Sequence, residues 1–439
     1  MKKFIQTIKN IYKIEELRKR IVYTFLLILV YRLGSFIVLP GIDPSVIAEF
    51  SASMSNRTDA LSLLNMFSGG AFGNVSIFAL GVMPYISASI VVQLLGVFVG
   101  KFRKMQAEES GRRKLNQITR LLTIVILCIQ GPAYISNIMH QYPNAFLVSS
   151  KLYILAATVI LLGGSMFVMW LGERITERGI GNGISLIIMI GIIARLPQAF
   201  MAEVLSKAGS TTGGILLLIV EFVILFFVFV AAIALVQAVR KVPVQYANRV
   251  IGNKQYGGVR QYIPLKVNAS GVMPIIFAQA IMLFPIIFSR FDATRGFAAA
   301  MSNYTGLWYN PVFGFLVIVF TYFYTAVTFQ PNMMAEDMKK NGGFIPGVKP
   351  GKKTMEYLDT IMTRIVLPGS IFLAIIAVLP AIATLCGVNN QFASFYGGTS
   401  LLILVGVVLD TLQQVESHLL MRHYDGLMKT GRLTGRSGM

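Results

Sequence analysis

The sequence predicts an all-α, polytopic membrane protein whose ten transmembrane helices form two related halves. Hydrophobic residues make up 55% of the 439 positions and charged residues only 13%. Apolar runs of about 20 residues, the length of a helix that crosses the hydrocarbon layer, recur along the whole chain. The tetrapeptide Gly-Val-Met-Pro at residues 81–84 returns at 271–274, so the second half echoes the first.

The ten predicted spans are separated by polar connections. They lie at residues 21–39, 75–98, 118–138, 152–171, 184–200, 214–236, 268–289, 311–330, 362–383 and 397–418. We expect a first half at 21–206, a hinge loop on the outer side at 207–214, a second half at 215–420 and a cytoplasmic tail at 421–439.

The first 20 residues predict an amphipathic helix on the cytoplasmic surface. They are basic, and Ile5, Ile8, Ile11 and Tyr12 offer an apolar stripe. A signal peptide would need a short apolar core followed by a small-residue cleavage site, which does not follow here. We therefore expect an interfacial helix that stays attached.

Positive charge gathers in alternate connections. The chain carries 39 Lys and Arg against 19 Asp and Glu, and most of the basic residues lie before the first span, after the last, and in every second loop. The positive-inside rule places these segments in the cytoplasm, with both termini. The basic residues are therefore better explained by membrane topology than by nucleic-acid binding of a soluble protein.

The repeated tetrapeptide predicts broken helices at matching places in two inverted halves. A proline inside a membrane-length run removes a backbone donor, so a helix must break or begin at Pro84 and Pro274. Five spans precede the Gly- and Ser-containing segment 207–214 and five follow it, so the second half starts from the opposite side of the membrane. The segment itself is either a hinge or an ordinary short loop.

Two cytoplasmic connections, at about 237–266 and 332–355, are unusually long and basic. Loops of this size and sign usually contact a partner. Ribosomal RNA and an acidic protein face are both compatible with the charge. The alternative is that these residues only set the topology.

Few residues in the spans could carry chemistry. Ionisable groups at membrane depth are costly and usually functional, but those of this chain are scattered one per span, and its three histidines lie at or beyond span ends. We expect no catalytic residue, no metal site and no cofactor. The residues concerned are Arg32, Arg195, Glu221, Asp410, His140, His418 and His423.

Aliphatic side chains recur at helical spacing near the broken helices. Val82 and Ile86 are four residues apart, as are Ile184 and Ile188, so each pair shares a helix face. Ile276 follows the second proline much as Ile86 follows the first. Such side chains could form a narrow, unwetted constriction, or they could be ordinary side chains of membrane helices.

The glycine-rich segment before the first proline is too short to span the membrane. Residues 65–74 either fold back into the protein as a stopper for a passage or form a simple outer loop.

Several blocks of sequence together resemble the SecY family of protein-conducting channel subunits. They are residues 39–43, 65–70, 76–90, 108–114, 176–185, 264–268 and 397–403, in the family's order and nearly from end to end. The resemblance implies a clamshell of two five-helix halves, hinged on the outer side, with a central pore. Through it the channel passes unfolded polypeptides outward or releases apolar segments into lipid.

The resemblance also implies roles for individual residues. The pore ring falls on Val82, Ile86, Ile184, Ile188, Ile276 and Ile403, with Val82 in place of the commoner Ile. The plug matches about 58–72, including Asn65, Met66, Phe67, Ser68, Gly69 and Gly70. Polar contacts across a lateral gate are expected at Ser87, Gln93 and Asn268.

Implied partners are small membrane subunits similar to SecE and SecG, a SecA-like motor ATPase, the ribosome, signal-bearing polypeptides and membrane lipids, in the bacterial inner membrane. The cytoplasmic contacts would use Arg240, Lys241, Arg249, Lys254 and Lys349. Here the chain departs from the family, because Lys349 replaces an Arg and Asn253-Lys254 replaces a paired Arg. Lys lacks the planar fork of Arg, so bidentate contacts would have to be rebuilt.

Two other classes compete with the channel. A secondary solute transporter would share the inverted repeat, but it should bring an ion or substrate site at the membrane midplane, for which the sequence offers no candidate. A membrane-embedded enzyme would need the chemistry that the spans lack.

Overall fold

The computed structural model describes residues 14–47, 50–51, 65–147, 151–208, 214–246, 249–251, 254–256, 260–282, 296, 301, 306 and 308–430. Some predicted features lie wholly or partly outside these residues. They are most of the N-terminal helix at 1–20, the plug before residue 65, the hinge at 209–213, the seventh span after residue 282, Asn253 and the tail after residue 430.

Helices occupy all ten predicted spans, which confirms the predicted fold class. Among the described residues, seven helices are long and apolar enough to cross a membrane. They are α7 (Glu109–Gln141), α8 (Lys151–Arg178), α9 (Gly183–Ala208), α10 (Gly214–Gln237), α14 (Tyr309–Thr328), α16 (Lys352–Leu385) and α18 (Gly398–Thr430). The other three spans contain α2 (Glu15–Gly34) and two shorter helices, α5 (Met83–Phe98) and α11 (Met273–Met282). Connections hold α6 (Gly100–Ala107), the 3₁₀ turn η1 (Pro143–Ala145), α15 (Pro331–Lys340) and α17 (Asn390–Ala393).

Both copies of the repeated tetrapeptide begin a helix. Gly81 and Gly271 have φ angles of 51° and 63°, a left-handed conformation that costs other residues roughly 1–2 kcal/mol. Two positions later α5 and α11 start, each with proline as its second residue, where the missing N–H needs no partner. The same local geometry therefore shortens the second and seventh spans.

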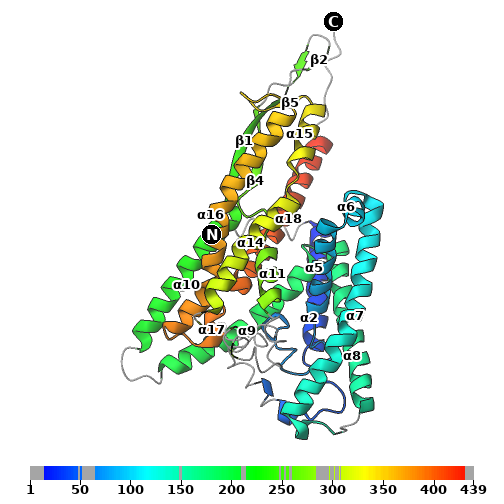
Figure 1. Cartoon of the computed structure of the whole chain (residues 1–439), viewed down its shortest axis with the longest axis vertical. Helices are drawn as coiled ribbons and strands as arrows, with labels where there is room; N and C mark the ends of the chain where they lie inside the picture. Colours follow the sequence, from blue (N-terminus) through cyan, green and yellow to red (C-terminus); the bar gives the residue numbers. More distant parts are fainter. Residues whose placement is uncertain are drawn as a thin grey trace.

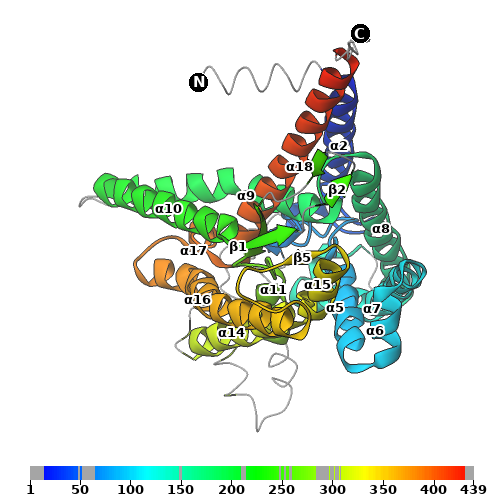
Figure 2. The same ribbon diagram turned by 90° about the horizontal axis from the view of Figure 1, so that it is seen from above.

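The helices form two groups that meet along α9. In the first group α7 packs against α5 and α8, and α8 packs against α2 and α9; in the second, α14 packs against α11 and α16, and α18 packs against α10, α11 and α16. α9 also packs against α10, α17 and α18 of the second group. Figure 1 shows the first group on the right and the second on the left, and Figure 2 shows α9 beside α10 on one flank and α5 beside α11 on another.

The outer faces of the helices are apolar. On α10, Ile215, Leu216, Phe226 and Phe227 are between 64% and 74% exposed. Contiguous apolar surface of this extent is unfavourable in water and marks contact with lipid or with another membrane protein. The chain is therefore a multi-pass membrane protein.

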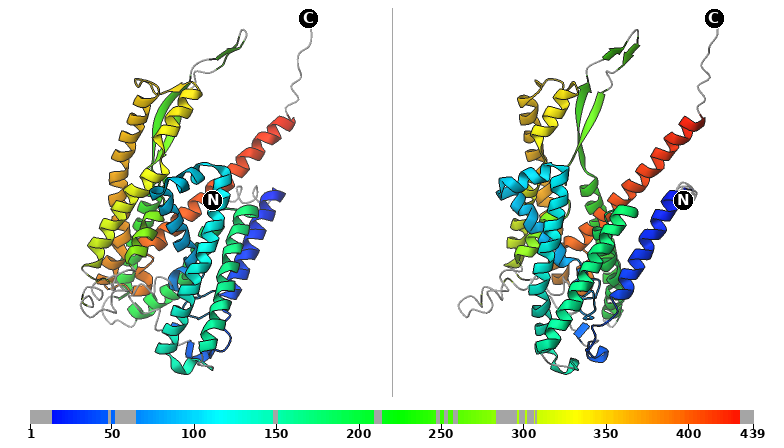
Figure 3. Two further views of the ribbon diagram at one scale, coloured as in Figure 1. Left: turned by 45° about the vertical axis from the view of Figure 1, so that its right-hand side comes forward. Right: turned by 90° about the vertical axis from the view of Figure 1, so that its right-hand side faces the viewer.

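A β-ribbon, which the sequence did not predict, rises from the first long loop. β1 (Val239–Tyr246) pairs antiparallel with β4 (Arg260–Lys266) and with β5 (Gly343–Phe344), and β2 (Arg249–Ile251) pairs with β3 (Lys254–Tyr256) beyond them. Alternate residues of β1 and β4 pack on α15 and α16. Figure 3 shows the ribbon extending from the helices at the end toward which α18 also projects. We call this the ribbon end, and the end where α9 stops and α10 starts the hinge end.

Replacing Gly271 with Ala tests the cost of the left-handed turn alone. An added Cβ would meet nothing within 4 Å, so the strain at φ 63° is the only penalty. We expect a loss of about 1 kcal/mol of stability, seen as a lower melting temperature of the purified protein in detergent. Gly100→Ala is the control, because its Cβ also enters open space but its φ is not left-handed. Equal losses in both variants would contradict the explanation.

Candidate functional site

Side chains from both halves meet in one apolar cluster. Val82 immediately precedes α5, Ile188 lies in α9 and Ile403 lies in α18, and each is at most 8% exposed. Ile86 and Ile184, one helical turn from Val82 and Ile188, pack against the same cluster. Five of the six predicted ring residues are thus brought together from three helices, two in the first half and one in the second.

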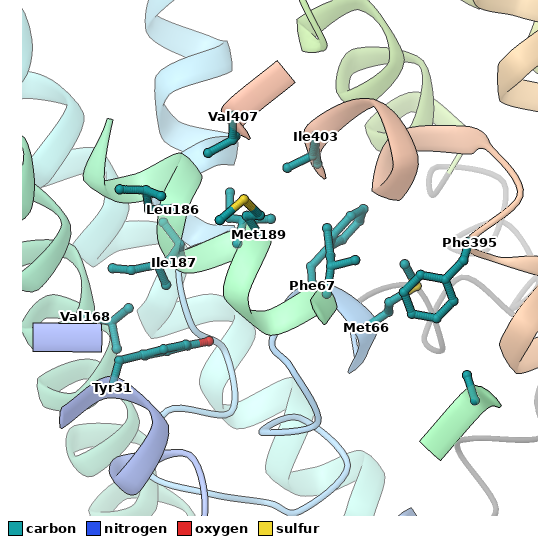
Figure 4. Close-up of a cluster of buried hydrophobic side chains, with 14 of the residues drawn as sticks. Tyr31, Met66, Phe67, Val168, Leu186, Ile187, Met189, Phe395, Ile403 and Val407 are labelled. Atoms are coloured by element: carbon teal, nitrogen blue, oxygen red, sulfur yellow. The ribbon is translucent and has the colours of Figure 1, made fainter. Parts of the chain in front are cut away.

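The sixth predicted ring residue, Ile276, is not among the described members of this cluster. Ile276 is half-buried in the first turn of α11, and Val272, just before that helix, packs against the cluster. Ile276 as a member of the ring therefore stays a prediction. Figure 4 shows Ile403 and Val407 of α18 beside Met189 of α9, where the two halves touch.

The predicted plug segment lies inside the protein. All six residues from Asn65 to Gly70 are buried, and Met66 and Phe67 belong to the apolar cluster (Figure 4). The segment forms one helical turn at 65–67 followed by tight turns. Asn65 Oδ1 accepts a hydrogen bond from the backbone N–H of Gly73 at 2.8 Å, which helps this irregular backbone remain buried.

Tyrosine and arginine side chains from neighbouring helices hold the plug by its backbone. Their hydrogen-bond donors point at three plug carbonyl groups: Tyr31 donates to Ser68 at 3.2 Å, Arg32 to Gly69 at 3.1 Å and Tyr134 to Phe72 at 2.6 Å. Tyr31 and Arg32 come from α2 and Tyr134 from α7, so the plug is anchored to the first half.

Two glycines allow the plug to approach α9 closely. Gly69 has φ 65°, and a Cβ on it would lie 2.8 Å from Cα of Gly191. A Cβ on Gly191 would in turn lie 2.8 Å from the carbonyl oxygen of Phe67. Any larger side chain at residue 191 would therefore push the plug away from its position.

A cavity of about 100 Å³ separates α5 of the first half from α11 and α14 of the second. Aromatic and apolar side chains dominate its lining, which consists of Gln93, Leu94, Phe277, Phe323, Tyr324, Val327 and Thr328. Among the described residues, the buried Oε1 atom of Gln93 has no hydrogen-bond partner, while its Nε2 donates to Ser89 of its own helix at 3.2 Å. The two halves are thus less tightly packed here than along α9.

The other two predicted gate residues make local hydrogen bonds. Ser87 donates to the carbonyl of Met83 at 3.1 Å, and Asn268 Oδ1 accepts from Ser270 at 3.4 Å. Contacts of these side chains across the gate remain a prediction.

Basic residues line the ribbon end. Arg240 and Lys241 are exposed on β1, and Lys349 is exposed in the turn before α16. Arg249 lies in β2 and Lys254 in β3, the two strands farthest along the ribbon. The exposed side chains of Arg240, Lys241 and Lys349 therefore make this end basic, and their contact with a partner stays a prediction.

Comparison with known proteins decides the family. The sequence profile of the SecY family matches residues 76–412. A relative from Chlamydia trachomatis, named protein translocase subunit SecY, is 39% identical over 454 residues, which cover 98% of this chain and 99% of the relative. The chain belongs to the SecY family.

Solved structures with the SecY fold are similar along the whole chain. A structure described as that of a protein conducting channel has 17% identity and a TM-score of 0.58, covering 95% of each chain. Canine Sec61 in a ribosome-channel complex has 16% identity and a TM-score of 0.54, again covering 95% of each. The resemblance found in the sequence is confirmed, and the solute-transporter alternative receives no support.

The SecY resemblance predicts a plug segment but not the residues that anchor this segment. The sequence marks Arg32 as a candidate functional residue, because an arginine within an apolar run is costly and usually has a role. Its partner is the backbone carbonyl of Gly69, which the spacing of residues does not reveal. Glu221 is likewise not isolated, since Lys207 lies 3.0 Å from it. Arg32 and Glu221 are therefore not isolated, because each contacts a segment that is distant in the sequence.

Replacing Tyr31 with Phe removes one plug anchor and keeps the aromatic packing. A lost hydrogen bond of about 1 kcal/mol should raise the population with a displaced plug about fivefold. We expect resting ion conductance of the reconstituted channel to rise accordingly. Tyr153→Phe is the matched control, since Tyr153 donates a similar bond, at 2.9 Å, to Pro40 outside the plug. A leak that rises equally in both variants would argue against plug anchoring.

Proposed function

We propose that this chain is the channel-forming subunit of a protein translocase, which passes unfolded polypeptides across a membrane and releases hydrophobic segments sideways into lipid. The observation that carries the proposal is the apolar cluster, which takes side chains from α5, α9 and α18 and includes Met66 and Phe67 of the plug. Apolar contacts are non-directional. The two halves that they join can therefore separate and close again around a translocated polypeptide of any sequence.

In the resting channel, the ring of Val82, Ile86, Ile184, Ile188, Ile276 and Ile403 acts as the seal. A narrow apolar constriction excludes ions because water and hydrated ions are unstable within it. The plug fills the space beside the ring, and a passing polypeptide must displace it.

The cavity between α5, α11 and α14 supports a lateral gate at this flank. Gln93, with Ser87 and Asn268, would make the polar contacts that keep the gate closed. Such contacts are worth on the order of 1 kcal/mol each within a membrane. An apolar segment of a substrate that fills the aromatic-lined cavity would therefore open the gate and pass into lipid.

The ribbon end faces the cytoplasm in this proposal, and both termini lie on the same side. Basic connections on cytoplasmic faces support the orientation, and the bacterial relative supports a bacterial inner membrane.

The partners follow from the exposed surfaces. Arg240, Lys241, Arg249, Lys254 and Lys349 would contact a SecA-like motor or the ribosome, whose phosphates suit a basic surface; Sec61 in the ribosome-channel complex supports the second. Small subunits similar to SecE and SecG, together with membrane lipids, would cover the apolar outer faces.

The passage can be tested with photo-crosslinking probes at Ile86 and Ile276. A stalled, signal-bearing precursor should crosslink at both positions, because the two lie on opposite halves of the proposed pore. A probe at Phe226, which is 65% exposed on the outer face of α10, serves as the control and should give little product. Silence at both pore positions would contradict the proposal.

The ribbon-end contact can be tested with Lys349→Glu. Because Lys349 is exposed, reversal of its charge should leave the melting temperature unchanged while severalfold slowing motor-driven export into inverted membrane vesicles. Lys101→Glu, another exposed lysine but in α6, is the control for a general charge effect. Equal slowing of export by both variants would contradict a specific role of Lys349 in partner binding.

A further inference from the structure

One edge of the β-ribbon is open. In the three-stranded sheet β1 lies between β4 and β5, and β4 pairs with β1 along its whole length, from Arg260 opposite Gln245 to Lys266 opposite Val239. Among the described residues, no strand pairs with the other side of β4. An unpaired edge of seven residues can accept a further strand from another chain.

The register shows which main-chain groups of β4 face this open edge. The N–H of Val267, directly after β4, donates to the carbonyl of Ala238 at 2.9 Å, so these two opposite residues form a hydrogen-bonded pair. In an antiparallel ladder, hydrogen-bonded and non-hydrogen-bonded pairs alternate. Tyr262, Pro264 and Lys266 therefore belong to non-hydrogen-bonded pairs, and their main-chain groups point away from β1.

The prolines of the ribbon agree with this assignment. Proline has no N–H, so within a sheet it is tolerated where its nitrogen faces away from the ladder. Pro264 of β4 meets this condition, and so does Pro243 of β1, which lies opposite Tyr262. Within the described part of the chain, the open edge therefore offers the N–H groups of Tyr262 and Lys266 and the carbonyl groups of all three outward residues.

Packing on the helices holds the open edge in place. The side chains of Ile263 and Leu265 belong to an apolar cluster with side chains of α16. Alternating with them, the side chains of Tyr262, Pro264 and Lys266 are exposed. The edge is thus ordered before any partner arrives, so a joining strand loses little affinity to the ordering of β4.

β4 leads directly toward the proposed pore. Val272, shortly after the strand, packs against the apolar cluster that contains the ring residues, and α11 starts at the next residue. Seen from the ribbon end, β1 projects between α9 and α11 (Figure 2). A chain that pairs with β4 would therefore lie on the approach to the ring.

Main-chain pairing suits a substrate that is unfolded and has no fixed sequence. Every polypeptide carries the same N–H and carbonyl groups, and a strand added to a sheet edge is bound through these groups. Each such hydrogen bond replaces bonds to water and gives a small net gain, so a pairing of a few residues forms and breaks readily. Pro264 and Lys266 are residue types that hinder permanent pairing at an edge. A passing chain would thus be aligned without being retained.

From these observations we infer that the open edge of β4 is a docking strand, with which an incoming unfolded polypeptide pairs as a further strand before it reaches the ring. The inference rests on the proposed function, because it concerns the same substrate at an earlier step. Tyr262, Pro264 and Lys266 act through their main-chain groups, and they hold the docked segment extended in front of the pore.

Removing one outward N–H tests the role of the main chain. Tyr262→Pro deletes this donor and keeps the hydrogen bonds between β1 and β4, because the N–H of residue 262 points away from β1. Tyr262→Val, which loses the aromatic ring but keeps the N–H, is the reference. We expect translocation of a precursor into inverted membrane vesicles to be severalfold slower with proline than with valine, at equal melting temperatures. Equal translocation rates in the two variants would overturn the inference.

Disulfide crosslinking tests the pairing itself. Tyr262→Cys, in a background with serine at Cys128 and Cys386, is combined with a precursor that is stalled by a folded domain and carries one cysteine at successive positions. Alternate side chains of an extended strand face the same side, so the disulfide yield should rise and fall with a period of two residues. Pro264→Val adds an outward N–H and should increase the yield. A yield without this period would contradict strand pairing.

The same vesicles distinguish the ways in which the inference can fail. A photo-crosslinking probe at Ile86 reports whether the stalled precursor reaches the ring. A precursor that reaches Ile86 without periodic crosslinks at residue 262 would refute the docking strand alone, whereas no crosslink at either position would contradict the proposed function. Crosslinks from residue 262 to a motor or to the ribosome, and not to the precursor, would assign the edge to that partner and also overturn the inference.

Discussion

The apolar contact between the two halves is the interaction on which the rest of the structure depends. Val82, next to α5, Ile188 of α9 and Ile403 of α18 belong to one apolar cluster, which is maintained without a directional bond. A membrane interior demands that backbone groups find partners within the protein, so each half must be complete as a helical body. The space between the two halves must therefore be filled by side chains. Branched aliphatic side chains fill it without attracting water or ions.

Polar interactions outside this apolar contact connect specific segments of the chain. Tyr31, Arg32 and Tyr134 hold the plug against the first half through hydrogen bonds, and Lys207 links the halves at the hinge end. In the proposed channel, polar groups would define which parts stay together, while the apolar seal and the gate cavity would define which parts separate. The division suits a protein that must change shape while remaining impermeable.

The sequence predicted features that depend on local rules and missed those that depend on distant contacts. Apolar run lengths predict the ten spans, and the prolines of the repeated tetrapeptide predict where α5 and α11 start. Lys207 was assigned to a flexible hinge loop, but it extends α9 because it is anchored by Glu221, 14 positions later and in another helix. The strands of the ribbon were not predicted for a related reason. Alternate residues of these strands pack on α15 and α16, which are distant in the sequence.

The way the plug is held has a consequence for how freely its sequence can change. In its described part, residues 65–72, three side chains from α2 and α7 donate hydrogen bonds to main-chain oxygens, at Ser68, Gly69 and Phe72, and not to plug side chains. Apart from the residues that face the apolar cluster and the glycine that lies close to α9, these anchors depend on the backbone path of residues 65–72 and not on its side chains. Unrelated plugs could therefore occupy the same place, provided that their chains follow the same turns.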